Sequence, residues 1–165
     1  MKAITMMLTI FILTSMSGQL LACNCLREYT VQEEVKYADA VLFGTVISKE
    51  LTMQTDSAII RSMTMRGSPM PTVAKYSLLV EYIYKGKITN DTITIFTGLG
   101  GGDCGVRFEI GKRYIVYGKN ETYFGKLFGE FQFPKGVNIF WTHTCMRTNI
   151  FRQEEIDEIE KYARE

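Results

Sequence analysis

The sequence is poor in histidine, in any excess of charge of one sign, and in long apolar runs. His143 is its only histidine, so neither a cysteine–histidine nor a serine–histidine–aspartate couple can form without it. Its 19 basic and 18 acidic side chains nearly cancel. This balance disfavours a nucleic acid or an anionic membrane as partner, because both require a basic excess or patch. Because the sequence offers no catalytic constellation, we expect a protein that is not an enzyme. We also expect no cofactor.

The N-terminal residues have the pattern of an export signal. Lys2 precedes an apolar stretch from Ile4 to Leu13, and small and polar residues follow before Cys23. The apolar stretch is too short for a mature membrane-spanning helix, and no later stretch is long and apolar enough to span a bilayer. The pattern predicts a signal peptide at 1–22 and one domain at 23–165, secreted to the extracellular space or the periplasm. Without Lys2, the basic and acidic side chains balance at 18 each.

All four cysteines, Cys23, Cys25, Cys104 and Cys145, follow the predicted signal. An exported chain meets an oxidising compartment, and an even number of cysteines favours two disulfides. Cys23 and Cys25 are too close in sequence to be partners, so each is expected to pair with one of the two distant cysteines. A zinc site that combines them with His143 is the alternative, and the export signal disfavours it.

Residue patterns predict a mainly β domain. Thr30 and Glu33 form a capping-box pattern, which predicts a short helix that ends at about Ala38. Strands are predicted over 40–48, with a bulge at Gly44, and over 75–84, 91–96 and 113–117. Residues 50–73 are interpreted as a loop or a loosely paired hairpin, and 118–142 receive no assignment. A helix is predicted over 153–164, with an apolar stripe formed by Ile156, Ile159 and Ala163. Several short strands and one closing helix favour a small closed barrel.

Three further patterns have ordinary interpretations. Gly100-x-Gly102-x-x-Gly105 has dinucleotide-binding spacing, but a strand rather than a helix follows it, so we interpret it as a turn that lets Cys104 reach a partner. The carboxylate pairs Glu33-Glu34 and Glu154-Glu155 are expected on solvated helix faces. Asn90 and Asn120 begin glycosylation sequons, whose use depends on the host.

The order of several motifs resembles the inhibitory domain of tissue inhibitors of metalloproteinases and the wider netrin-like family. Cys23-Asn24-Cys25 stands at the expected mature start, and an Ala-Asp-Ala-Val segment at 38–41 leads into the first strand. Gly102-Asp103-Cys104, the segment 108–114 and Cys145 resemble later parts of that family's pattern. The resemblance covers nearly all of residues 23–163, although Lys36 stands where the animal inhibitors have a cysteine.

The resemblance implies a five-stranded OB-type barrel with a flanking short helix, a C-terminal helix, and the disulfides Cys23–Cys104 and Cys25–Cys145. It also implies that the Cys23 amino and carbonyl groups chelate the zinc of a target metalloprotease, which would be the partner. Asn24 would enter the specificity pocket of the protease. Leu26, Gly102 and Asp103 would contact the protease on either side.

Residues 20–23, Leu-Leu-Ala-Cys, also resemble a bacterial lipobox, in which the cysteine thiol receives a lipid. A lipid on Cys23 would leave one of the other cysteines without a partner and can be accompanied by acylation of the amine. A free Cys23 amine and a lipidated Cys23 are therefore mutually exclusive. The alternative function is a non-catalytic binding module that a lipid anchors at the cell envelope.

Overall fold

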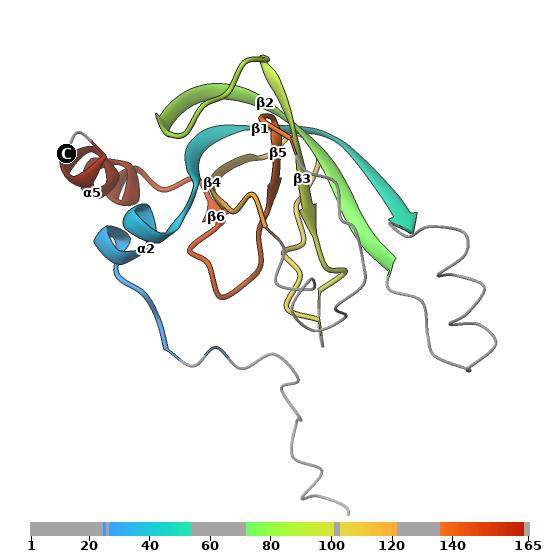
Figure 1. Cartoon of the computed structure of the whole chain (residues 1–165), viewed down its shortest axis with the longest axis horizontal. Helices are drawn as coiled ribbons and strands as arrows, with labels where there is room; N and C mark the ends of the chain where they lie inside the picture. The colour runs from blue at the N-terminus through green and yellow to red at the C-terminus, as the bar shows by residue number, and fades with distance from the viewer. Residues whose placement is uncertain (1–24, 26, 54–71, 101–102, 122–135, 164–165) are drawn as a thin grey trace, which may run out of the picture.

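The computed structural model describes residues 25, 27–53, 72–100, 103–121 and 136–163 (Figure 1). The predicted signal, Cys23, Asn24, Leu26, Gly102 and most of the predicted loop at 50–73 lie outside these residues. In chain order, its described elements are α2 (Val31–Tyr37), β1 (Ala40–Met53), β2 (Thr72–Lys85), β3 (Thr92–Thr97), β4 (Arg113–Gly118), β5 (Ile139–Trp141), β6 (Asn149–Ile150) and α5 (Gln153–Tyr162). The prediction of a mainly β chain with a short helix and a C-terminal helix is confirmed.

The strands form one mixed, open ladder in the order β5-β3-β2-β1-β4-β6. Neighbouring strands are antiparallel except β3 and β5, which are parallel. The count of six described strands differs from the five expected, because the two-residue β6 adds to the edge of β4. Beyond the end of β4, Lys119 and Trp141 exchange two backbone hydrogen bonds of 2.8 and 2.7 Å.

The longest strands, β1 and β2, form a bent hairpin. β1 pairs with β4 over Ala40–Thr45 and with β2 over Val41–Met53, and three register shifts interrupt its pairing with β2. One shift lies at Gly44, as predicted, where a Cβ would collide with the carbonyl oxygen of Leu79. The predicted loop at 50–73 begins too early and ends too late, because 50–53 and 72–73 are paired strand residues. Hydrogen-bonded pairing with β2 extends β1 beyond the residues whose composition favours a strand.

β4 separates two apolar cores, because its successive side chains point to opposite faces. Tyr114 and Val116 lie in one core, and Ile115 and Tyr117 in the other. The central core on one face consists of Ala40, Leu42, Val46, Ala74, Tyr76, Leu78, Ile93, Ile95, Val106, Phe108, Tyr114, Val116 and Phe140. The helix-side core on the other consists of Val31, Val35, Ala38, Val41, Ile115, Tyr117, Met146, Ile156 and Ile159. Burial of each valine, leucine, isoleucine, phenylalanine or methionine side chain among them stabilises the fold by about 1.5–3 kcal/mol.

The two helices pack against each other beside the sheet (Figure 1). The predicted capping box begins α2: the Glu33 amide donates to the Thr30 hydroxyl at 3.2 Å, and the Thr30 amide donates to the Glu33 carboxylate at 3.0 Å. Ile156 and Ile159 of α5 are buried in the helix-side core, as their spacing predicts.

The expectation that both carboxylate pairs are solvated is wrong for one member of each pair. Glu34 is 1% exposed and Glu155 is 6% exposed. Both lie on the helix faces that meet the helix-side core, because their spacing from Val31 and Ile159 places them there. The tertiary packing of α2 against α5 therefore buries carboxyl groups that each helix alone would leave in water.

Candidate functional site

The segment at the start of the described chain is held by a disulfide between Cys25 and Cys145. Their Cα atoms are 5.4 Å apart and the two residues are separated by 120 positions. This bond confirms one of the two expected pairings. It also excludes the alternative zinc site as proposed, because two of its sulfur ligands are joined to each other. A loop of this length contributes about 4–5 kcal/mol in the chain-entropy account.

The loop that carries Cys104 lies against the loop that carries Cys145. The Thr144 amide donates to the Cys104 carbonyl oxygen at 2.8 Å. Cys104 has a φ of 56°, a left-handed conformation that few residues other than glycine adopt. The structure thus brings Cys25, Cys104 and Cys145 together, and among the described residues no cysteine is a free thiol. Cys23 lies outside those residues, so its pairing with Cys104 stays a prediction.

Asp103 organises the glycine-rich loop from within. Its carboxylate accepts hydrogen bonds from the amides of Leu99, Gly100 and Gly105 at 2.5, 2.8 and 3.1 Å. Gly105 is required by space, because a Cβ there would overlap the backbone of Gly98. These hydrogen bonds of Asp103 hold residues 99–100 and 105 close together next to Cys104, in line with the ordinary interpretation of the pattern as a turn. A contact between Asp103 and a protease stays a prediction.

Two arginines fix the segment between Cys25 and α2. Arg27 pairs with Glu33 at 2.9 Å and lies 4.4 Å from the centre of the Tyr29 ring. Arg147 donates from Nη1 to the Tyr29 carbonyl oxygen at 3.0 Å. The Arg147 contact lies close to the disulfide, because Arg147 is two residues from Cys145. It therefore joins the chain after Cys145 to the segment that follows Cys25.

Arg147 belongs to a buried polar cluster that the sequence did not indicate. Its Nε donates to the Glu155 carboxylate at 3.0 Å, and the Tyr117 hydroxyl donates to the same oxygen at 2.9 Å. Burial, together with the charge of Glu155, raises the pKa of Tyr117. The available signal was weak: Glu155 lies one residue before Ile156 of the predicted apolar stripe, which places it at the edge of the buried face.

Glu34 has no such partners. Neither of its carboxylate oxygens has a hydrogen-bond partner. Burial raises its pKa to about 7, while the positive charges of Arg147 and Lys119 act in the opposite direction. The helical spacing of Val31, Glu34 and Val35 would have placed all three on one face, which is the signal that could have found it.

His143 lies beside the disulfide. Its Nδ1 accepts a hydrogen bond from the Cys145 amide at 3.2 Å, and burial lowers its pKa. The imidazole is therefore neutral near pH 7 and takes part in the local structure of the Cys145 loop.

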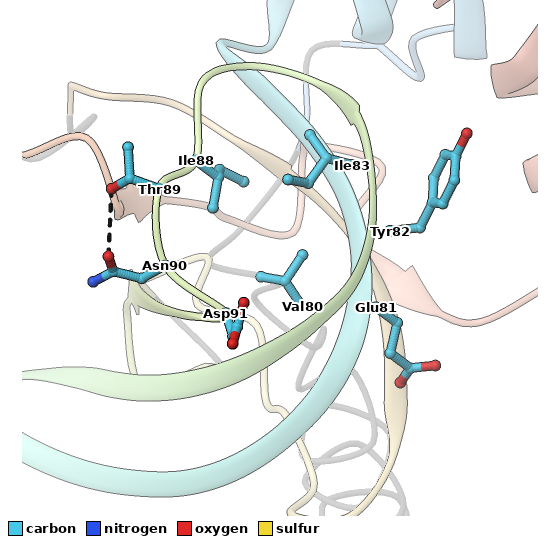
Figure 2. Close-up of a pocket in the computed structure, with 8 residues that line it drawn as sticks. All are labelled: Val80, Glu81, Tyr82, Ile83, Ile88, Thr89, Asn90 and Asp91. Atoms are coloured by element: carbon cyan, nitrogen blue, oxygen red, sulfur yellow. Dashed lines mark hydrogen bonds between the residues drawn. The ribbon is translucent and has the colours of Figure 1, made fainter.

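The glycosylation sequon at Asn90 borders a separate cavity. This cavity is an open pocket with a volume of about 310 Å³, and it is lined by the end of β2 and the loop after it. Val80, Ile83 and Ile88 point into the pocket, whereas Tyr82 points away from it (Figure 2). The Asn90 side chain is exposed and accepts only a 3.4 Å contact from the Thr89 hydroxyl. The cavity shares no lining residue with the segment that Cys25 anchors.

Comparison of the sequence with models of known protein families and with curated proteins found no match. Within the part of the chain that the structure describes, no group of three or more histidine, cysteine, aspartate or glutamate side chains is placed to hold a metal ion. None of the helices in that same part is both long enough and apolar enough to cross a bilayer.

Proposed function

We propose that the chain is an exported inhibitor of zinc metalloproteases, which binds its target through a mature N-terminus at Cys23. The observation that carries this proposal is the Cys25–Cys145 disulfide with the Cys104 loop hydrogen-bonded beside it. Two residues of extended chain span about 7 Å. Cys23 is thus within reach of the Cys104 loop, and a Cys23–Cys104 bond would pin the chain end at a second point.

A pinned chain end fits the chemistry of zinc chelation. The α-amine and carbonyl oxygen of Cys23 would bind the target's zinc as a five-membered ring, after the amine loses its proton. The ordinary pKa of an α-amine is about 7.7–8, so this loss costs little near neutral pH. Rigid disulfides at Cys23 and Cys25 reduce the ordering cost of binding. Asn24 would enter the specificity pocket, with Leu26, Gly102 and Asp103 at its sides.

The proposed scaffold is a five-stranded OB-type barrel formed by β1 to β5. The strand order, the parallel pairing of β3 with β5, and the two hydrogen bonds between Lys119 and Trp141 support closure of the ladder between β4 and β5. In this arrangement β6 is an addition to the outer edge of β4. Closure would remove exposed sheet edges, which otherwise promote aggregation.

Inhibition by the mature chain tests this function directly. The chain that begins at Cys23 is titrated against a panel of zinc metalloproteases, beside a matched variant with one alanine added before Cys23. We expect the added residue to weaken inhibition by at least about a hundredfold, because it converts the Cys23 amine into a peptide amide that does not bind zinc, and the new amine lies one residue beyond the proposed disulfide. No inhibition, or equal inhibition by the two chains, would reject the mechanism.

The mass of the exported N-terminus separates this function from the alternative. A bare Cys23 amine with Cys23 joined to Cys104 is expected for the inhibitor. A diacylglyceryl group on Cys23 would overturn the inhibitor proposal and support a lipid-anchored, non-catalytic binding module of the cell envelope.

A further inference from the structure

Glu34 carries a carboxyl group without a hydrogen-bond partner, at the contact between α2 and the rest of the protein. The side chain is 1% exposed and lies on the face of α2 that also buries Val31 and Val35. That face packs against α5, and neither carboxylate oxygen has a hydrogen-bond partner. An unpaired charge in such a place is costly, so docking of α2 favours the protonated form of the carboxyl group.

Arg147 and Lys119 are the cations whose charges lower the pKa of Glu34, and both already have other partners. Arg147 binds Glu155 and the Tyr29 carbonyl oxygen. Lys119 donates at 2.9 Å to the Tyr37 carbonyl oxygen and at 3.0 Å to Asp39. Each cation therefore holds one end of the segment that contains α2.

Three other ionisable groups around α2 have partners of their own. Glu33 on the same helix is partly exposed and paired with Arg27. The Lys85 ammonium group of β2 donates to carbonyl oxygens at the end of α2, and the Tyr117 hydroxyl of β4 donates to Glu155 of α5. An ionised Glu34 would have to take Arg147 or Lys119 from the contacts that hold α2 and the residues before it.

We propose that Glu34 is a proton-operated latch, which holds α2 docked when protonated and favours its release, with residues 27–38, when ionised. The inference goes beyond the proposed inhibitory function and does not depend on it. In the released state the Glu34 carboxyl group is solvated and has the ordinary pKa of a glutamate.

The direction of the pH effect follows from the two protonation states. The pKa of Glu34 is about 7 in the docked state, against an ordinary value of 4.5. Below about pH 4.5 both states are protonated and pH has no effect through this group. Between that value and about 7 only the released state loses its proton, so release becomes more favourable as pH rises. Above about pH 7 the effect is complete.

Amide hydrogen exchange of the full exported chain, with its disulfides intact, tests the latch. After correction for intrinsic exchange rates, we expect the protection of the α2 amides to fall roughly fiftyfold between about pH 5 and pH 7.5. In the isosteric variant Glu34→Gln the same comparison should show little change, because position 34 no longer titrates. Glu33→Gln is the matched control on the same helix and should retain the wild-type pH dependence.

Two measurements keep the test decisive when the glutamine variant is disturbed. Glu34→Leu fills the apolar face and should give pH-independent protection of α2. Carbon NMR of the Glu34 carboxyl group in the wild-type chain should give a midpoint near 7. A midpoint near the ordinary 4.5, or equal pH dependence in the wild type and both position-34 variants, would overturn the proposal.

Discussion

Glu34 and Glu155 are both buried on the inner faces of helices, yet their surroundings differ. Glu155 accepts hydrogen bonds from Arg147 and Tyr117, whereas Glu34 has no partner for either oxygen. Charged and hydroxyl donors favour the ionised form of a buried carboxyl group, whereas burial without such donors raises its pKa, as it does for Glu34. Single-residue identity therefore does not decide which state a buried glutamate adopts.

The Arg147–Glu155 pair leads to a prediction at the residue scale. Arg147→Met removes the cation while keeping an apolar stem, so it leaves Glu155 buried with only the Tyr117 hydroxyl. We expect the free energy of unfolding, measured in urea, to fall by about 3–5 kcal/mol.

Lys75→Met is the matched control for that change. Lys75 pairs with Glu50 at 3.0 Å on the surface, where both side chains are more than a third exposed. Removal of such a pair costs at most about 1 kcal/mol. Equal losses for the two variants would show that the Arg147 contacts are no stronger than a surface pair.

At the scale of the element, α2 is a seven-residue helix that is too short to persist alone. Its N-terminus is satisfied by the capping box, which the sequence predicted. Its C-terminus depends on distant residues: the Lys85 ammonium group donates to the carbonyl oxygens of Val35, Lys36 and Ala38 at 2.7, 3.1 and 2.7 Å. A lysine 47 to 50 residues away is not visible in a local pattern.

Replacement of that lysine gives a prediction for the helix. Lys85→Met leaves three carbonyl groups at the end of α2 without a charged donor, so we expect about 1.5–3 kcal/mol of destabilisation. Urea unfolding measures the loss, and hydrogen exchange of the α2 amides should show it locally. Lys87→Met, on the exposed loop that follows, is expected to change stability by less than about 0.5 kcal/mol. An unaltered α2 in Lys85→Met would contradict the capping role.

At the scale of the molecule, the Cys25–Cys145 bond joins the start of the described chain to the loop before α5. The double variant Cys25→Ala/Cys145→Ala removes this link without leaving a free thiol. The chain-entropy account predicts a loss of about 4–5 kcal/mol in the free energy of unfolding. Chemical denaturation under oxidising conditions measures this difference. A loss below about 1 kcal/mol would indicate that the unfolded chain gains little freedom when the bond is absent.

Some features of this protein follow from local sequence alone. The capping box at Thr30, the bulge at Gly44 and the buried stripe of Ile156 and Ile159 were predictable, because each depends on residues a few positions apart. Ile93 and Ile95 alternate along β3, and both lie in the central core. The pairing of Cys25 with Cys145 came from the family resemblance rather than from local pattern.

Other features were decided only when distant segments met. β5 is only three residues long, too short for a local pattern to define, and it becomes a strand through its parallel pairing with β3. The ends of the β1–β2 hairpin are strands because they pair with each other. Glu34 is buried because α2 meets α5, and the Asp103 carboxylate has hydrogen-bond partners because the amides of Leu99, Gly100 and Gly105 lie around it. Local periodicity determines which face of an element is apolar. Only the tertiary structure determines what covers that face, and hence which polar groups lose water and which of them find a partner.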